Sequence, residues 1–326
     1  MSDEVTTTTT EPTHQSKVDK KLAKEDLTGR PTNEVIRHGL REGLRGFLDL
    51  TKVIVPVYFA VALLSYFGVI AFLAQWLSPV MGLFGLPGEA AIVIMTGYFL
   101  TLYSAIGALG ALHLPPTAIT AIGFMLLFAH ALPVEWAILQ KMGARAWRIT
   151  LTRLALSIIG GLVFALFHRG EIPQAAATAS LASIPFWALM VKTGLGCANL
   201  MGLVFAIIMP VTVLSALARA RGVMPKIARR IYFITERIGV GETAIAPLLV
   251  GVLFGLLYGG GALIAMTRTG MIKKEDVQTV GTFLGICHSI FEDPLLFVAI
   301  GGNFVWLWII RLLTAVVLTP LLRRWV

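Results

Sequence analysis

Two histidines and three acids interrupt otherwise apolar segments of this chain. Glu135 follows His130, and Glu292 and Asp293 follow His288. A charge at the centre of a bilayer costs about 2.5–3.5 kcal/mol on insertion scales, so acids persist there when they meet a partner, a solute or a proton. These residues could bind a polar solute or relay protons. A buried structural network whose members neutralise one another is the second interpretation, and it is favoured more for His130 than for the denser group at His288.

Two further acids, Glu89 and Glu242, each follow a glycine and open an apolar segment. Each is predicted to lie at a helix N-terminus, where the helix dipole stabilises a carboxylate by about 0.3–1 kcal/mol. That effect alone could account for either residue. Because the pattern occurs twice, we favour a role in binding a solute or a coupling ion, H⁺ or Na⁺.

The remaining candidates are uncharged. Tyr103 and Tyr258 stand beside small residues, which allow close helix packing or the approach of backbone to a ligand. Thr243 and Asn199 also lie in apolar surroundings, where such a residue alone is more often part of a hydrogen bond between helices than a ligand.

Motifs for catalysis are missing from the sequence. It contains neither HExxH nor GxxxxGK[ST], and Cys197 and Cys287 form no CxxC pair. We therefore predict no catalytic residue, no metal-ligand set and no cofactor, and we do not expect an enzyme.

An ordered series of matched residues indicates an internal duplication. The offset is 153 residues between Gly88 and Gly241 and 158 residues between Arg153 and Arg311. The other matched pairs, in the same order, are Pro56 and Pro210, Glu89 and Glu242, Tyr103 and Tyr258, His130 and His288, Glu135 and Asp293, and Gly143 and Gly301. Arg311 lies deep in its segment and needs a carboxylate, for which Asp293 or Glu292 is the expected partner.

Composition places the chain in a membrane. Of its 326 residues, 56% are apolar and 14% are charged, and the mean hydropathy of +0.80 is far above that of a soluble domain. Residues 34–52 are predicted to form a charged, amphipathic interfacial helix. Eight apolar segments follow, of which 181–218 is too long for one crossing and is expected to divide at Gly194 and Gly196. They are 53–77, 87–112, 117–140, 149–168, 181–218, 242–267, 277–300 and 303–322.

The distribution of basic residues predicts the topology. The net charge of +9 comes from clusters between the apolar segments, as the positive-inside rule requires, and not from a nucleic-acid-binding face. Clusters at 141–153 and 219–237 are expected in the cytoplasm, and 169–180 and 268–276 outside. These assignments agree only if 117–140 and 277–300 are re-entrant hairpins. Three crossings per half then turn the second half upside down.

We therefore predict an all-α polytopic membrane protein made of two inverted repeats. Each repeat has about three transmembrane helices, a re-entrant hairpin and an interfacial helix. The expected divisions are a disordered cytoplasmic tail at 1–33, repeats at 34–168 and 181–326, and a linker at 169–180.

The repeated Gly-Glu helix start, the Leu-Tyr pairs before small residues and the sequence His288-Ser-Ile-Phe-Glu-Asp-Pro294 resemble the nucleoside-recognition, or Gate-domain, membrane proteins. That group is similar to spore maturation proteins A and B, and more distantly to the gates of concentrative nucleoside transporters and of the ferrous iron permease. The resemblance covers about residues 50–322. It implies a transport-type fold with paired gates, with Glu89 and Glu242 facing a central cavity, and it does not fix the solute. Gly196-Cys197-Ala198 is similar to the Gly-Cys pair of the iron-permease gate, but the rest of that pattern is absent.

The leading hypothesis is a secondary transporter of a small polar solute such as a nucleoside. It would lie in a bacterial inner membrane with its N-terminus in the cytoplasm. The expected partners are the solute, membrane lipid and a second copy of the chain, and not nucleic acid. A non-transporting membrane scaffold, a passive channel and a metal-ion permease are the alternatives.

Overall fold

The computed structural model describes residues 27–168, 170, 185–268, 272–322 and 325. Within these ranges every regular element is a helix, which confirms the all-α prediction. Residues 1–26 of the expected tail and all but Gly170 of the expected linker lie outside the described residues.

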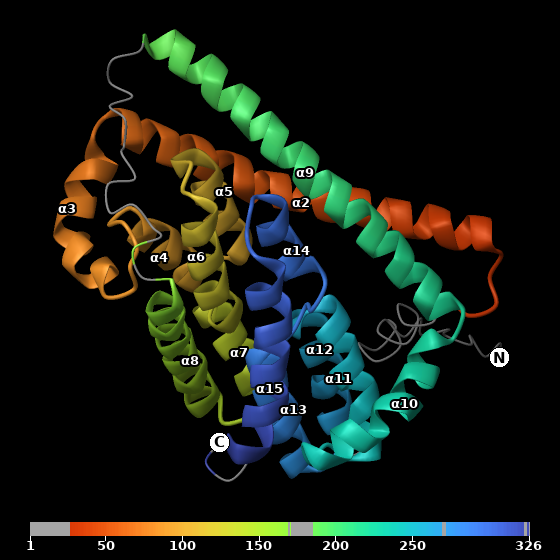
Figure 1. The fold of residues 1–326 in the computed structure, drawn as a ribbon. Helices are drawn as coiled ribbons and strands as arrows, with labels where there is room; N and C mark the ends of the chain where they lie inside the picture. Colours follow the sequence, from red (N-terminus) through yellow and green to blue (C-terminus); the bar gives the residue numbers. More distant parts are fainter. Residues whose placement is uncertain (1–26, 169, 171–184, 269–271, 323–324, 326) are drawn as a thin grey trace, which may run out of the picture.

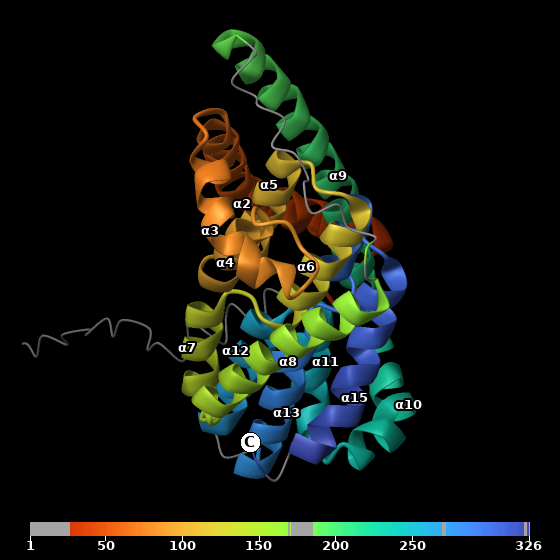
Figure 2. The same ribbon diagram turned by 60° about the vertical axis from the view of Figure 1, so that its left-hand side comes forward.

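The helices fall into two bodies (Figures 1 and 2). The long helices α2 and α9 cross at one end of the molecule together with α3, α4 and α5, and a bundle containing α7, α8, α11, α12, α13 and α15 lies below them. The bounds are α2 (Thr32–Tyr66), α3 (Val69–Gly82), α4 (Ala90–Phe99), α5 (Leu102–Leu112), α6 (Pro116–Phe128), α7 (Leu132–Met142), α8 (Ala146–Phe167), α9 (Phe186–Ala220), α10 (Val223–Arg237), α11 (Glu242–Phe254), α12 (Leu256–Arg268), α13 (Lys274–Ile286), α14 (Glu292–Ala299), the π-helical turn η2 (Val305–Ile310) and α15 (Arg311–Leu322).

Two predicted helix divisions are wrong, because α2 and α9 are each continuous over 35 residues. The expected interfacial segment 34–52 is the first half of α2, and Gly194 and Gly196 lie inside α9. A glycine costs a helix only about 1 kcal/mol. At Gly196 the missing side chain makes room for Tyr58, whose hydroxyl oxygen would collide with a Cβ there. The glycine thus permits close packing of α9 on α2 and does not end the helix.

The structure places helical hairpins at other segments than the two that were predicted to re-enter the membrane, 117–140 and 277–300. Helices α4 and α5 pack against each other, as do α11 and α12, whereas α6 and α7, and likewise α13 and α14, are joined end to end with almost no contact between them. Each hairpin arm has 10 to 13 residues, a length of about 15–20 Å that cannot cross about 30 Å of hydrocarbon. Pro116–Met142, in contrast, is long and apolar enough to span. We refer to α4–α5 as the first hairpin and to α11–α12 as the second hairpin.

Local chain chemistry explains where the hairpins turn. Thr101 caps α5 by accepting a hydrogen bond from the backbone N–H of Ser104, which satisfies one of the free donors at the helix start. Gly255 separates α11 from α12 with a φ of +92°, a conformation that suits glycine. These signals were present in the sequence, but the charged residues at 130–135 and 288–293 directed the prediction elsewhere.

The two halves repeat their backbone geometry. Gly68 and Gly222, 154 residues apart, both have positive φ, and so do Ala131 and Ser289, 158 residues apart. The repeat correspondences therefore extend to local conformation. The predicted inversion of one half relative to the other stays a prediction.

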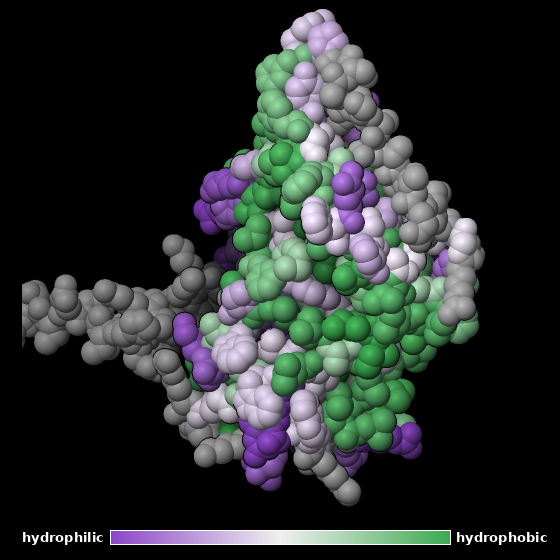
Figure 3. Space-filling view, turned by 90° about the vertical axis from the view of Figure 1, so that its left-hand side faces the viewer, coloured by the Kyte–Doolittle hydropathy of each residue, from purple (hydrophilic) through white to green (hydrophobic). Residues whose placement is uncertain are grey.

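The surface is that of a multi-pass membrane protein. Among the described residues, five helical stretches are long and apolar enough to cross a membrane. Large apolar side chains such as Phe72, Trp76 and Phe167 are exposed on α3 and α8. Figure 3 shows a broad apolar surface on one face, with polar residues gathered mainly at its edges. Soluble monomers rarely expose a patch of this size.

Candidate functional site: a buried cluster between the two halves

Two turns bring the repeat-matched histidines together. Residues 129–131 join α6 to α7, and residues 287–291 join α13 to α14. We call them the first and second histidine turns, because they carry His130 and His288. Both rings are buried, their centroids are 5.0 Å apart, and their Nε2 atoms are 3.2 Å apart. The sequence match between the two histidines therefore corresponds to contact in space.

The orientation of both rings is fixed by the backbone. His130 Nδ1 lies 2.8 Å from the carbonyl oxygen of Leu126, and His288 Nδ1 lies 2.6 Å from that of Leu284. A carbonyl oxygen can only accept, so each Nδ1 carries the hydrogen and donates it. Each Nε2 is then directed into the space between the halves.

Glu135 lies at the centre of the contacts. Its Oε1 is 3.2 Å from His130 Nε2 and 3.4 Å from His288 Nε2, and its Oε2 is 2.8 Å from an Arg153 terminal nitrogen. Arg153 is fully buried and also donates to the carbonyl oxygens of Phe128 and His130, at 3.0 and 3.1 Å. The arginine on α8 thereby holds the first histidine turn and the carboxylate together. We call His130, Glu135, Arg153 and His288 the central cluster.

Arg311 occupies the matching place in the second half but lacks the matching ion pair. Its Nε donates to the carbonyl oxygen of Ile286 at 3.3 Å, as Arg153 does to Phe128. Neither terminal nitrogen has a hydrogen-bond partner within the described residues, and Asp293 Oδ2 also has none.

The predicted ion pair between Arg311 and Asp293 or Glu292 is therefore wrong. All three residues are described, and no contact of 4.0 Å or less joins the arginine to either acid. The aspartate at 293 stands where the first half has Glu135, and its side chain is one methylene shorter.

A second link between the halves involves the first hairpin. The hydroxyl of Tyr103 on α5 donates to Glu292 Oε1 on α14 at 2.6 Å. Hydrogen bonds to a charged acceptor contribute about 1.5–3 kcal/mol. The side chain of the repeat-matched Tyr258 lies outside the part of the chain that the structure describes.

The other predicted site residues do not join the central cluster. Glu89 is buried as the N-cap of α4, and Glu242 is the exposed first residue of α11, so their predicted places at helix starts are confirmed. Thr243 and Asn199 are exposed. None of the four makes a hydrogen bond or ion pair to the central cluster, and their binding role stays a prediction.

The structure adds the two arginines to the candidate site. The sequence analysis matches Arg153 with Arg311 in the duplication and expects a structural ion pair with a carboxylate, not a role in the site. Their signal was an arginine within an apolar helix, 23 residues after a histidine in each half (153 − 130 and 311 − 288).

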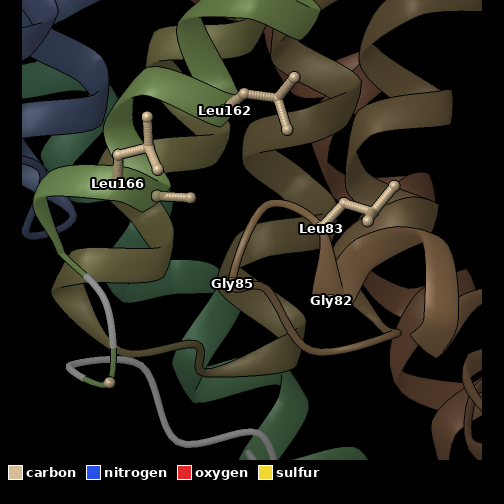
Figure 4. Close-up of a pocket in the computed structure, with 7 residues that line it drawn as sticks. Gly82, Leu83, Gly85, Leu162 and Leu166 are labelled. Carbon is tan, nitrogen blue, oxygen red and sulfur yellow. The ribbon is translucent and has the colours of Figure 1, made fainter.

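A surface groove lies elsewhere on the molecule. It lies between the end of α3 and the C-terminal half of α8, and its lining includes Leu83, Leu162 and Leu166 (Figure 4). Leu162 is more than two helical turns along α8 from Arg153. The groove therefore does not belong to the central cluster.

Buried charges at breaks in helices, between two similar halves, place this chain among the polytopic all-α membrane proteins. In agreement, residues 47–145 match the family model described as Gate, nucleoside recognition. The chain is also 32% identical over 289 residues to a Bacillus subtilis (strain 168) protein named uncharacterized membrane protein YvoD, which covers 86% of this chain and 91% of that relative. No solved structure matches the chain. The chain belongs to the Gate-domain, or nucleoside-recognition, family of membrane proteins.

Proposed function

We propose that the chain is a secondary transporter of a small, polar, nucleoside-like solute. It would work in a bacterial inner membrane with its N-terminus in the cytoplasm, driven by H⁺ or Na⁺. The observation that carries the proposal is the central cluster, which both halves build from the broken ends of helices. Discontinuous helices that meet between inverted repeats commonly form the substrate and ion sites of secondary transporters. The family's description supports a small-molecule solute.

The cost of the buried charges favours transport over a scaffold role. Glu135, Asp293, Arg153 and Arg311 are all at least nine-tenths buried. Each would cost about 2.5–3.5 kcal/mol at the bilayer centre without compensation. A scaffold gains nothing from such an interior, because apolar residues would pack the two halves at lower cost.

The two hairpins supply the asymmetry that alternating access needs. The first hairpin packs on α2 and α9, so that a Cβ at Gly107 would stand 2.9 Å from the carbonyl oxygen of Ile54. The second hairpin packs on α7, beside Ile138, and Gly261 in its second arm has no neighbour within 4 Å. One sequence pattern thus occurs in two packing arrangements. Exchange of the two arrangements between the hairpins would open the cluster to the opposite side of the membrane.

The test begins with ligand identification. Purified full-length protein is screened by thermal unfolding against nucleosides, nucleobases and amino acids, because a ligand of the folded state raises stability by RT ln(1 + [L]/Kd). Hits are then measured for uptake into proteoliposomes under an imposed proton or sodium gradient. We expect uptake above empty liposomes that disappears when the gradient is dissipated.

Three variants locate the site. Glu135→Gln should abolish uptake, and Glu242→Gln tests the predicted gate acid. Glu34→Gln, on the exposed first turn of α2, is the control and should behave as wild type. Uptake that no gradient can drive uphill would indicate a passive channel. Absence of any stabilising solute together with absence of uptake would favour a scaffold, and full activity of Glu135→Gln would remove the central cluster from the mechanism.

A further inference from the structure

Three potential ligand atoms meet at the centre of the cluster. His130 Nε2 and His288 Nε2 are 3.2 Å apart, and Glu135 Oε1 lies 3.2 Å from the first and 3.4 Å from the second. They form a nearly equilateral triangle of two imidazole nitrogens and one carboxylate oxygen. All three residues are buried and come from both halves of the chain.

The hydrogen bonds of the two rings leave both Nε2 atoms as acceptors beside the carboxylate oxygen of Glu135. Each Nδ1 donates its hydrogen to a backbone carbonyl, so each neutral ring presents an unprotonated Nε2. The Glu135 carboxylate is an acceptor as well. Three acceptors this close in a buried place repel one another unless a cation stands between them. A proton on one ring supplies a single N–H, whereas a metal ion satisfies all three atoms.

The spacing of the triangle fits a tetrahedral metal ion. Zinc binds histidine nitrogen at about 2.0–2.1 Å and carboxylate oxygen at about 2.0–2.2 Å, which places neighbouring tetrahedral ligands about 3.3–3.4 Å apart. The sides of 3.2, 3.2 and 3.4 Å match this value within a few tenths of an ångström. Three protein ligands leave the fourth position open for water or a solute atom.

The surroundings also hold each ligand as metal sites do. Ligating histidines commonly donate their second ring N–H to a carbonyl oxygen, and ligating carboxylates are themselves hydrogen-bonded. His130 and His288 donate to Leu126 and Leu284, and Glu135 Oε2 is held by an ion pair with Arg153, while its Oε1 faces the two rings. The geometry is therefore set before an ion arrives.

We propose that His130, His288 and Glu135 bind one divalent first-row transition-metal ion of the zinc type. Two imidazoles and one carboxylate favour Zn²⁺, Co²⁺ or a neighbouring metal over Mg²⁺ and Ca²⁺, which prefer oxygen ligands. The ion joins the first histidine turn to the second and so holds the two halves together at their centre. This site goes beyond the proposed solute transport and does not depend on it.

Cobalt binding tests the site directly. Full-length protein without a histidine tag is stripped of metal with a chelator and titrated with Co²⁺ in detergent micelles. We expect one equivalent to bind, with the intense visible absorption of tetrahedral Co²⁺, and Zn²⁺ to displace it. His288→Gln and Glu135→Gln should each weaken binding more than about 100-fold, the upper end of what loss of an outer partner costs.

A histidine with a similar backbone contact provides the control. His168 Nδ1 also contacts the carbonyl oxygen four residues earlier, that of Phe164 at 3.0 Å, but His168 lies outside the cluster. His168→Gln should bind Co²⁺ as wild type does. His288→Cys should retain the ion and add a thiolate-to-cobalt charge-transfer band, which separates ligand exchange from misfolding.

Three outcomes would overturn the site. They are no Co²⁺ binding by a cooperatively folded wild type, unchanged binding in both Gln variants, and no new band in His288→Cys. If Co²⁺ stays bound during exposure to chelator, the ion is a resident one. If Co²⁺ is released and crosses the proteoliposome membrane, the ion is a transported one. Either result keeps the site. Because binding is measured without transport, metal binding without solute uptake would refute the proposed transporter and leave the metal site standing.

Discussion

Arg153 and Arg311 allow one test of the packing argument within a single molecule. They are repeat-matched, and both are almost completely buried. Arg153 makes an ion pair at 2.8 Å and two hydrogen bonds to carbonyl oxygens, whereas Arg311 makes one hydrogen bond of 3.3 Å. We therefore compare Arg153→Met with Arg311→Met, two substitutions that keep much of the side-chain volume.

The expected costs differ strongly. Arg153→Met leaves Glu135 buried without its partner, which costs about 3–5 kcal/mol, and removes two hydrogen bonds of about 1 kcal/mol each. Arg311→Met loses one weak bond, and it also removes a guanidinium whose terminal nitrogens have no partner among the described residues. We expect its effect to lie within about 1 kcal/mol of zero. The difference of at least about 4 kcal/mol corresponds to a change of roughly a thousandfold or more in the unfolding equilibrium.

Reversible unfolding in mixed micelles, followed by tryptophan fluorescence, measures both variants. The double variant Glu135→Gln with Arg153→Met should recover part of the loss, because it removes the uncompensated charge as well. Equal costs for the two arginine variants, or a larger cost at Arg311, would refute the interpretation of the asymmetry. A small stability cost joined to a loss of solute uptake at Arg311 would mark it as a functional residue.

Two further predictions concern the hairpins. Gly107→Ala should destabilise the protein by about 1–3 kcal/mol, because the new methyl group would stand 2.9 Å from the carbonyl oxygen of Ile54. Gly261→Ala, which has no neighbour within 4 Å, should be neutral or stabilise the helix by up to about 1 kcal/mol. The same unfolding assay compares the two variants, and equal effects on stability would contradict the difference in packing. Tyr103→Phe should cost about 1.5–3 kcal/mol through loss of its 2.6 Å hydrogen bond to Glu292, and a variant as stable as wild type would show that this bond contributes nothing.

The sequence predicted the chemistry of the site better than its geometry. The matched offset of His130 and His288 indicated that they belong together, and the cost of burying Glu135 indicated that it needs a partner. The choice of Arg153 as that partner depends on three helices meeting, which no local pattern records. The absence of an ion pair at Arg311 likewise depends on how the helices of the second half meet, which no local pattern records.

The fold was predicted correctly where composition decides and wrongly where packing decides. Hydropathy was sufficient to identify a polytopic helical membrane protein. It could not show that α2 and α9 continue through their charged or glycine-containing segments, because such residues end a helix only if no neighbour covers them. The hairpins were predicted at the wrong segments because polar residues within an apolar segment have two explanations. They can mark a break in a helix that spans the membrane, or the tip of a re-entrant hairpin.

The hydrogen bonds at the two histidine turns have a mechanical consequence. The backbone N–H of Ala131 donates to Gly97 O at 2.8 Å in the first hairpin, and that of Ser289 donates to Gly251 O at 3.3 Å in the second. Ala131 and Ser289 each directly follow a histidine. A hairpin that moves away must therefore break this bond or move the neighbouring imidazole with it. The positions of the two imidazoles are thus coupled to the positions of the two hairpins.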